Sequence, residues 1–372
     1  MRLGLTLSAW DTGDLADAVR LAVEADRLGY SVCWAPEAYG TDAATLLATV
    51  AARTERIDIG SGVFQIPARA PAMTAMTAAT LDALSGGRFR LGLGVSGPQV
   101  SEGWYGVRFD HPLARTRDYV QVVRQVLRRQ RLEYAGKHLT LPLPDGPGKP
   151  LRLSVRPLRP DLPVYLAAVG PRNLELAGEI ADGWLGVFVA PEFVPGSLAH
   201  LRAGRARADR SGGSGGSDHT DSSGSTGSTG STGSLAGFDV VACAPVVTGS
   251  DVEACALPVR GYAALYLGGM GSRTQNFYNA LAARMGYAEQ AERVQDLYLA
   301  RQHRDAAAAV PFEFVDSTSL LGPADRIAGR LRAYADAGVT TVAVSPFGVT
   351  VEDRIATLHT TAEAFAAAGV GE

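Results

Sequence analysis

Cysteine is scarce in this sequence, and so are long apolar runs and excess charge of either sign. The 372 residues include three cysteines, Cys33, Cys243 and Cys255, an odd number without CxxC spacing. This argues against a disulfide framework, and we expect buried free thiols in a reducing cytosol. No uninterrupted apolar run reaches the roughly 18 residues that a membrane span needs. The formal net charge of -3, without interleaved basic and aromatic residues, argues against a nucleic-acid partner.

A secretion signal is also missing from the first residues. Met1 leads directly into RLGLTLS, which we predict to be the first core strand, without the longer apolar stretch and small-residue cleavage site of a signal peptide. We therefore expect a cytoplasmic protein without a membrane partner. The composition, with 46% hydrophobic and 20% charged residues, is typical of a chain that buries a sizeable core.

The most informative stretch of the chain lies between residues 57 and 98. Two short apolar runs, Ile57 to Val63 and Phe89 to Val95, flank a helical pattern, and both lead into glycine-rich turns. This pattern predicts a βαβ unit with glycine at both strand ends. In parallel α/β folds the carboxyl ends of the strands carry the ligand site, so these glycines indicate backbone close to a flat or phosphorylated ligand. The alternative is that they only form tight turns.

Strand-like and helix-like segments alternate along almost the whole chain, which predicts a parallel sheet covered by helices. We expect strands over residues 3–8, 31–35, 57–63, 89–94, 164–169, 184–189, 239–247 and 340–345. Helices are expected over 14–28, 41–53, 71–84, 112–130, 173–181, 324–337 and 351–368. Eight strands favour an α/β fold of the closed (β/α)8 TIM-barrel type with insertions over an open sheet.

We expect one domain over residues 1–372, with two segments outside the repeat. Residues 132–163 are rich in proline and glycine and predict an insertion with a hairpin near the barrel mouth. Residues 211–234 consist mostly of glycine and serine and predict a flexible connector. A native low-complexity segment and an engineered replacement both fit that composition.

Six motifs occur in order along the chain: GYSVCWAPEAYGTDA (29–43), the stretch 57–98, SEGWYGVRF (101–109), PVYLAAVGPRNLELAGEIADGW (163–184), YLGGMGSRTQNFYN (266–279) and GPADRIAGRLRAYADAGVTTVAVSP (322–346). Together they resemble the luciferase-like monooxygenase superfamily, and within it the branch of coenzyme F420-dependent oxidoreductases. The resemblance covers nearly the whole chain and implies the same barrel. It also implies hydride transfer between reduced deazaflavin and a small organic substrate.

The resemblance places the cofactor ring in the barrel mouth against a bulge on the third strand, here Ser61, Gly62 and Val63. Relatives often have a non-proline cis peptide there, which we expect at Gly62-Val63; an ordinary trans turn is the alternative. Ser96 and Gly97, after the fourth strand, are expected to leave room along the edge of the ring. No metal is expected.

Glu37 matches an acidic active-site residue of the deazaflavin-dependent relatives and is our catalytic candidate. Its carboxylate could hydrogen-bond the cofactor, donate a proton, or lie on the surface. Many relatives have a histidine next, where this chain has Ala38. This departure weakens dehydrogenation of a sugar phosphate or alcohol and favours reduction of an activated C=C or C=N bond.

The phosphodiester tail of the cofactor requires hydrogen-bond donors. Val169, Gly170 and Arg172 lie where a helix is expected to begin, so free N–H groups and the guanidinium could bind phosphate there. Arg273 is a second candidate, and a solvated surface arginine is the alternative.

Four aromatic residues follow predicted strands and are candidates for the substrate pocket, with core packing as the alternative. They are Trp10, Tyr39, Trp104 and Tyr105. The resemblance further implies a homodimer through the second and third helices, where Ala72, Ala75, Ala78 and Ala79 would permit close packing. Two other functions stay open: an FMN-dependent luciferase-like monooxygenase and a noncatalytic flavin- or deazaflavin-binding protein.

Overall fold

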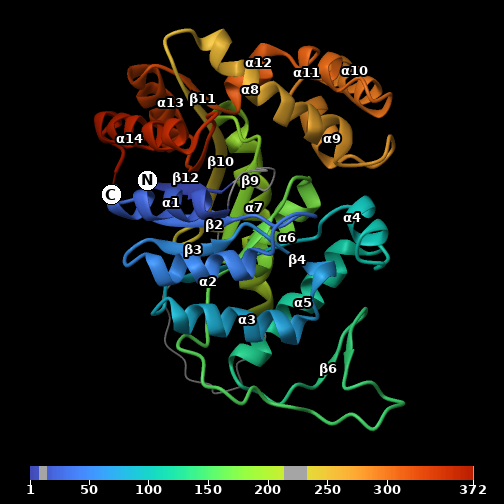
Figure 1. The fold of residues 1–372 in the computed structure, drawn as a ribbon. Coiled ribbons are helices and arrows are strands. Elements are labelled where there is room, and N and C mark those ends of the chain that lie inside the picture. The colour runs from blue at the N-terminus through green and yellow to red at the C-terminus, as the bar shows by residue number, and fades with distance from the viewer. Residues whose placement is uncertain (8–14, 213–232, 372) are drawn as a thin grey trace, which may run out of the picture.

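A computed structural model of the chain describes residues 1–7, 15–212 and 233–371. Within these residues, eight parallel strands form a closed barrel (Figure 1). In order around the barrel they are β1 (Arg2–Thr6), β2 (Val32–Ala35), β3 (Asp58–Ser61), β5 (Phe89–Gly94), β8 (Val164–Ala167), β9 (Gly183–Val187), β10 (Asp239–Thr248) and β12 (Thr341–Pro346). Strand β12 pairs with β1 and closes the ring. The predicted (β/α)8 fold is confirmed.

Helices cover the outside of the barrel. They are α1 (Leu15–Arg27), α2 (Ala43–Arg53), α3 (Pro71–Leu84), α5 (Pro112–Leu127), α6 (Pro171–Ile180), α7 (Val194–Gly212), α13 (Ala324–Asp336) and α14 (Val351–Ala368). Local signals define several ends: Asp42 accepts a hydrogen bond from the Thr45 amide at the start of α2, and Thr350 and Asp353 form a capping box on α14. The sequence predicted the bounds of α3 and α14 correctly, and missed α7.

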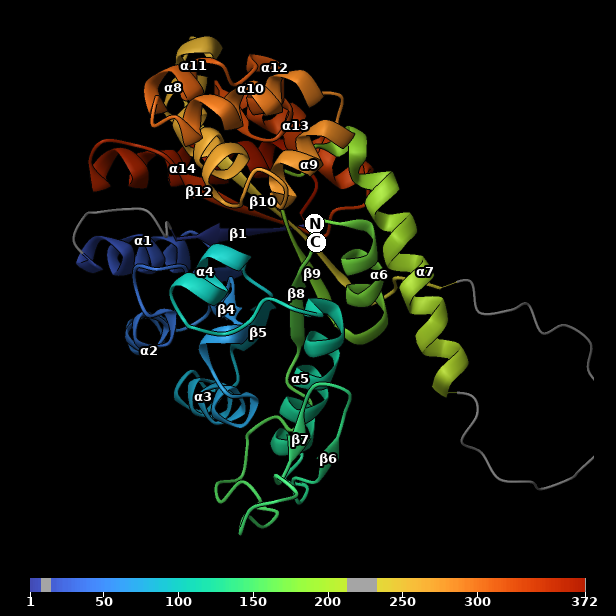
Figure 2. The ribbon, with the colours of Figure 1, turned by 90° about the vertical axis from the view of Figure 1, so that its right-hand side faces the viewer.

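Helix α7 packs along α6, as Figure 2 shows, because both helices have a glycine at the contact. A Cβ added at Gly178 would lie 2.0 Å from the Leu201 carbonyl oxygen, and one at Gly204 would lie 1.9 Å from that of Glu175. Of the predicted glycine- and serine-rich connector, residues 211 and 212 end α7, and residues 213–232 lie outside the described residues.

The barrel interior is filled by side chains from the strands. Trp34 is fully buried and packs edge-on against Tyr165 at 5.0 Å between ring centroids. A Cβ at Gly60 would lie 2.4 Å from the Trp34 ring, so only glycine leaves room for it. At the amino ends of the strands, the buried Asp239 carboxylate accepts hydrogen bonds from Arg90 at 3.1 Å and from Tyr165 at 3.0 Å, and pairs with Arg2 at 2.9 Å. This network of polar groups fills the amino-terminal end of the barrel, which we call the barrel floor.

Helix α3 presents a different face to solvent from the one we predicted. Ala75, Ala78 and Ala79 are at most 3% exposed, and Ala72 is partly buried against the same core, so this small-residue face packs against the barrel. The large exposed apolar side chains of this helix are Met73, Met76 and Leu84.

The predicted hairpin in residues 132–163 is formed by β6 (Tyr134–Ala135) and β7 (Thr140–Leu141). It packs on α5, where the Tyr134 hydroxyl is 2.8 Å from the Asp118 carboxylate. Arg159 of the same segment forms an ion pair with the buried Asp82 of α3. In the described structure, no residue of 132–163 lines the large cavity discussed below.

A second insertion separates β10 from the short strand β11 (Leu320–Gly322), which pairs with the end of β10. It contains α8 (Val252–Ala264), a π-helical turn (Leu265–Gly269), α9 (Phe277–Arg284), α10 (Ala288–Leu299), α11 (His303–Ala308) and α12 (Phe312–Ser317). These orange helices gather at one end of the molecule in Figures 1 and 2 and have their own hydrophobic cluster. We refer to residues 249–319 as the helical insertion.

Four short elements complete the described structure: β4 (Phe64–Gln65), two 3-10 turns (Ile66–Ala68 and Pro191–Phe193) and α4 (Pro98–Gly103). Among the described helices, none has both the length and the apolar character that crossing a lipid bilayer requires.

Candidate active site

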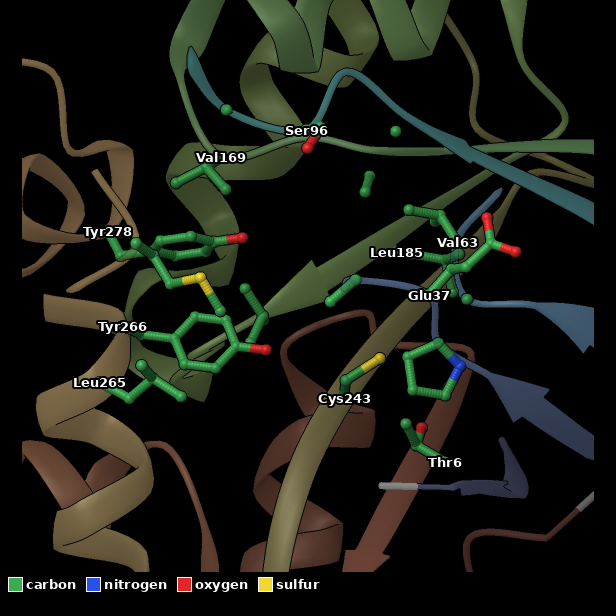
Figure 3. A pocket seen from close by; sticks show the side chains of 18 of the residues that line it. Thr6, Glu37, Val63, Ser96, Val169, Leu185, Cys243, Leu265, Tyr266 and Tyr278 are labelled. Atoms are coloured by element: carbon green, nitrogen blue, oxygen red, sulfur yellow. The ribbon is translucent and has the colours of Figure 1, made fainter. Parts of the chain in front are cut away.

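A cavity of about 1450 Å³ opens at the carboxyl ends of the barrel strands, between the barrel and the helical insertion. Each barrel strand, or the segment that directly follows it, contributes to the lining. The residues are Thr6, Glu37, Gly62, Ser96, Val169, Val187, Cys243 and Pro346. The carboxyl end is where barrels of this type carry their active sites. This cavity is therefore the candidate active site (Figure 3).

The wall that follows β3 has the conformation that we predicted. The Gly62-Val63 peptide bond is cis, and both residues line the cavity. A Cβ at Gly94 would lie 2.5 Å from Val63 Cγ2, so glycine on β5 leaves space for the valine side chain. Two glycines therefore define the position of Val63.

Ser61 requires a correction, because its hydroxyl lies between the strands and not in the cavity. The side chain is fully buried, donates to the Gly92 carbonyl at 2.8 Å and accepts from the Gly92 amide at 2.9 Å. Ser61 thus joins β3 to β5, and only Gly62 and Val63 of the predicted bulge reach the cavity.

Ser96 and Gly97, which follow β5, also line the cavity. Ser96 has a left-handed backbone with φ of 62°, and its hydroxyl donates to the Gln65 side chain at 2.6 Å. The Gln65 amide in turn donates to the Ala38 carbonyl at 2.7 Å and to the Tyr105 hydroxyl at 3.3 Å. Tyr105 therefore supports the wall from behind, and it is not among the described residues that line the cavity.

Glu37 lines the cavity but uses its carboxylate elsewhere. Both oxygens pair with Arg69, at 2.5 and 2.7 Å, and they also accept from the backbone amides of Ala43 and Gln65. Arg69 also contacts Asp42 at 2.6 Å. In Figure 3 the carboxylate points away from Tyr266 and Tyr278. This bidentate ion pair favours a scaffold role for Glu37 over our prediction of a catalytic one.

Val169, Gly170 and Arg172 line the cavity where α6 begins. Gly170 precedes the first turn, and a Cβ added to it would have no atom within 4 Å. The exposed Arg172 side chain and the first N–H groups of α6 therefore border open space in which an anion would fit.

Arg273, the second candidate for the phosphate, lies outside the described lining of the cavity. Its side chain is 61% exposed and forms an ion pair with Asp296.

Two of the three remaining aromatic candidates for the substrate pocket line the cavity. Tyr39 and Trp104 line the cavity and are 49% and 65% exposed, whereas Trp10 lies in 8–14, outside the described residues.

Three tyrosines of the helical insertion line the cavity and were missed from the sequence: Tyr262, Tyr266 and Tyr278. Their rings surround the buried Phe188, which follows β9. Burial, and then the neighbouring Tyr266, raises the pKa of Tyr262 and of Tyr278 above the ordinary value of 10.0. The spacing of Tyr262 and Tyr266, one helical turn apart, was the available signal.

Within the described residues, no group of three or more histidine, cysteine, aspartate or glutamate side chains could hold a metal ion. The charged lining residues are Glu37, Arg172 and Arg354. The remainder of the described lining is neutral, and it contains no histidine or lysine.

Known proteins resemble this chain over most of its length. The family model described as luciferase-like monooxygenase matches residues 4–341. A Mycobacterium tuberculosis protein named as a putative coenzyme F420-dependent oxidoreductase is 39% identical over 357 residues, covering 93% of this chain and 95% of that protein. The 5,10-methylenetetrahydromethanopterin reductase of Archaeoglobus fulgidus is 26% identical over 331 residues, covering 87% and 88%.

A similar fold is found among solved structures. The coenzyme F420 dependent tetrahydromethanopterin reductase from Methanopyrus kandleri matches with a TM-score of 0.75 at 23% identity, covering 96% of this chain and 97% of that one. At this identity the likeness concerns the fold.

Proposed function

The chain belongs to the luciferase-like monooxygenase family, and from this premise we propose that it is a coenzyme F420-dependent oxidoreductase. It would transfer a hydride between reduced deazaflavin and a small organic substrate. The observation that carries the choice of cofactor is the 39% identity, over 93% of this chain, to a protein named for the same coenzyme. The cavity at the strand ends supports the proposal, because it can hold a large ligand.

The residues of the cavity fit this group. Its volume of about 1450 Å³ exceeds the usual 300–1,000 Å³ of ligand pockets and leaves space for both cofactor and substrate. Gly62 and Val63 would support the ring, and Ser96 and Gly97 would border its edge. Gly170 leaves space for the phosphate beside Arg172.

When bound, the reduced deazaflavin supplies the hydride, and the chain positions the reactants. Val63 would lie against the ring and orient it. Apart from Glu37, Arg172 and Arg354, the described lining is neutral, which favours an uncharged substrate. Since Glu37 is paired with Arg69 and Ala38 replaces the histidine of many relatives, we propose reduction of an activated C=C or C=N bond over dehydrogenation of an alcohol.

Titration of the protein with coenzyme F420 and with FMN tests the cofactor. We expect F420 fluorescence to change on binding and FMN to bind more weakly. Tighter binding of FMN would support the flavin-dependent monooxygenase instead. Binding of F420 without reduction of any unsaturated carbonyl or imine would support a noncatalytic binding protein.

The phosphate site has a matched pair of variants. Arg172→Ala should weaken F420 binding about 10- to 100-fold, because it removes a charged donor to phosphate. Arg273→Ala removes an arginine outside the cavity and should leave the F420 dissociation constant unchanged. Equal dissociation constants for Arg172→Ala and the wild type would remove Arg172 from the site.

We further propose that the protein is a homodimer through α2 and α3. Met73 and Met76 are 52% and 49% exposed on one side of α3, and Leu84 at its end is 62% exposed. Sedimentation velocity should show a dimer, and Met73→Lys together with Met76→Lys should shift it to the monomer. A wild-type monomer at micromolar concentration would contradict this assembly.

We also infer a reducing compartment, the cytoplasm. Cys33, Cys243 and Cys255 are all free, and burial raises the pKa of Cys33 to about 12 and that of Cys243 to about 11. Cell fractionation would check this location.

A further inference from the structure

Two facing walls and a base enclose the cavity. One wall contains Val63 and Ser96, at the strand ends, and the other comes from the helical insertion, with Tyr266 and Tyr278 (Figure 3). The base is formed by residues that lie within barrel strands β1, β2 and β10. If the cofactor ring lies against Val63, as proposed above, the substrate occupies the space between the ring, the insertion and this base.

Trp34 of β2 is buried inside the barrel and still borders the cavity. It is 0% exposed, and its indole nitrogen Nε1 has no hydrogen-bond partner in the described structure. The buried Trp184 differs, because its Nε1 donates to the Ala168 carbonyl at 2.9 Å. An indole nitrogen can only donate, so Trp34 lacks an acceptor. Leaving a buried donor without an acceptor is unfavourable, which makes this N–H group a candidate for a ligand contact.

The packing of the Trp34 ring indicates on which side Nε1 lies. A Cβ added at Gly60 would lie 2.4 Å from Trp34 Cε3, and one at Gly62 would lie 3.7 Å from the same atom. Nε1 is not among the three nearest atoms in either case. Cε3 and Nε1 are on opposite edges of an indole, so Nε1 lies on the edge away from β3. Because β2 lies between β1 and β3, that edge is on the side of β1.

Thr6 of β1 is in register with Trp34. Its hydroxyl oxygen is also buried without a hydrogen-bond partner in the described structure, and it lies beside the Cys243 thiol (Figure 3). A thiol forms only weak hydrogen bonds. Burial raises the pKa of Cys243 to about 11, so the thiol is uncharged at neutral pH. Trp34, Thr6 and Cys243 thus form a small uncharged polar cluster, and all three line the cavity.

The chemistry of this cluster fits an uncharged oxygen atom. A carbonyl or hydroxyl oxygen has two lone pairs, so it can accept from the Trp34 N–H and also contact the Thr6 hydroxyl. An indole and a hydroxyl carry no formal charge and would not offset the desolvation of a carboxylate or a phosphate. The cofactor phosphate has its own proposed place beside Arg172, after β8.

The cluster also lies on the side of the barrel that the ring would leave open. In the barrel order, β10 is opposite β3, after which Val63 would support the ring. Strand β12 pairs with both β10 and β1, which brings Cys243 and Thr6 to the same side. A substrate between the ring and the insertion can therefore contact this side of the base.

We propose that Trp34 Nε1 and Thr6 Oγ1 bind an uncharged carbonyl or hydroxyl oxygen of the substrate at the base of the cavity. This rests on the proposed function and adds a feature of its substrate, an oxygen that accepts a hydrogen bond. A site built to bind an oxygen discriminates against an analogue that lacks it, because the buried donor is then left unpaired. Trp34 and Thr6 are thus assigned as residues that determine substrate specificity.

NMR of the tryptophan indoles tests the contact without turnover. The chain has four tryptophans, so ¹⁵N labelling gives four indole N–H resonances, and Trp34→Phe identifies one of them. We expect 2-cyclohexen-1-one and cyclohexanol to move the Trp34 resonance downfield, and cyclohexene, which has no oxygen, to cause no such movement. The Trp184 resonance is the internal control and should stay in place, since Ala168 already accepts from it. A Trp34 resonance that moves with neither oxygen compound would overturn the proposal.

The dissociation constant of 2-cyclohexen-1-one, obtained from the same titration, tests the hydroxyl. Thr6→Val keeps the shape of the side chain and should raise this constant about 3- to 10-fold, whereas Thr6→Ser should stay close to the wild type. Thr49→Val is the matched control, because Thr49 is exposed on α2 and lies outside the described lining. Equal constants for Thr6→Val and the wild type would overturn the assignment of Thr6.

Titrations with and without oxidised F420 separate this site from the proposed function. Downfield movement of the Trp34 resonance with F420 alone would assign the oxygen to the cofactor ring and overturn its assignment to the substrate. If the resonance moves with 2-cyclohexen-1-one but F420 does not bind, the proposed function fails and the oxygen site stands. If F420 binds and 2-cyclohexen-1-one is reduced but the resonance does not move, only the oxygen site fails.

Discussion

Replacing Glu37 with glutamine distinguishes an acid catalyst from a part of the scaffold. The Glu37 and Arg69 side chains are 6% and 15% exposed, so breaking their ion pair leaves the Arg69 charge largely desolvated. Removing one partner of such a pair costs about 3–5 kcal/mol. Glutamine still accepts one hydrogen bond, and Asp42 keeps a carboxylate 2.6 Å from Arg69. We therefore expect Glu37→Gln to lower the free energy of unfolding by about 2 kcal/mol.

A double-mutant cycle with Arg69→Met identifies the pair as the cause. Urea unfolding of both single variants and the double variant should give a coupling free energy of about 1.5–3 kcal/mol. Asp161→Asn breaks the exposed ion pair with Arg128 and should cost about 0.5 kcal/mol, which calibrates the assay.

Enzyme kinetics then separate the two roles of Glu37. A scaffold residue changes kcat by a small factor, whereas loss of a general acid lowers it about 10²-fold or more. A drop of that size in Glu37→Gln, with the free energy of unfolding unchanged, would refute our reasoning and restore Glu37 as the proton donor.

Three further outcomes follow from buried polar contacts. Asn276→Asp removes the amide donor to the Tyr266 and Leu267 carbonyls and should lower the free energy of unfolding in urea by about 1–3 kcal/mol; an unchanged value would contradict the role of this buried side chain. Asp239→Asn should lower the free energy of unfolding by about 3–5 kcal/mol in urea, with kcat unchanged, since the barrel floor lies outside the cavity lining. Burial opposes ionisation of Asp26, but the amides of residues 55–57 outweigh it and lower its pKa below 3.8. The Asp26 carboxylate therefore stabilises the fold above about pH 4, and this contribution is lost as the pH falls through the lowered pKa. In Asp26→Asn the urea midpoint of unfolding should depend less on pH between about pH 5 and about pH 3 than it does in the wild type.

The barrel could be predicted from the sequence because its signals are local. Apolar runs end in glycine, Pro71 begins α3, and Thr350 caps α14. Residues at the ends of these strands and helices therefore indicate where each one begins or ends. The helical insertion was not predicted, although Asp251 caps α8 and Asn276 caps α9, because its helices pack against one another around residues such as Phe314 and do not repeat the strand–helix pattern. This packing joins residues that are distant in the sequence, so no short stretch of the sequence predicts it.

Only part of the candidate site could be predicted from the sequence. Backbone positions at strand ends, such as Gly62 and Gly97, follow from the strand pattern and line the cavity. The partners of polar side chains do not follow from it. Ser61 bonds to a strand 31 residues away, and Glu37 pairs with Arg69 across 32 residues. Such contacts determine whether a polar side chain can interact with a ligand. They join residues that are far apart in the sequence, so the local pattern does not predict them.

The two walls of the cavity therefore belong to different parts of the chain, and we expect mutations in one wall to leave the structure of the other unchanged. The wall at Gly62, Val63 and Gly97 lies in the segments that directly follow β3 and β5, two strands that pair within the barrel. The facing wall belongs to an insertion with its own hydrophobic cluster, joined to the barrel through the β10–β11 pairing and the ring of Phe188. Substitutions at Tyr266 or Tyr278 can thus alter substrate binding while the opposite wall stays intact. Cofactor affinity and substrate preference should for this reason respond to different sets of mutations, even though both ligands share one cavity.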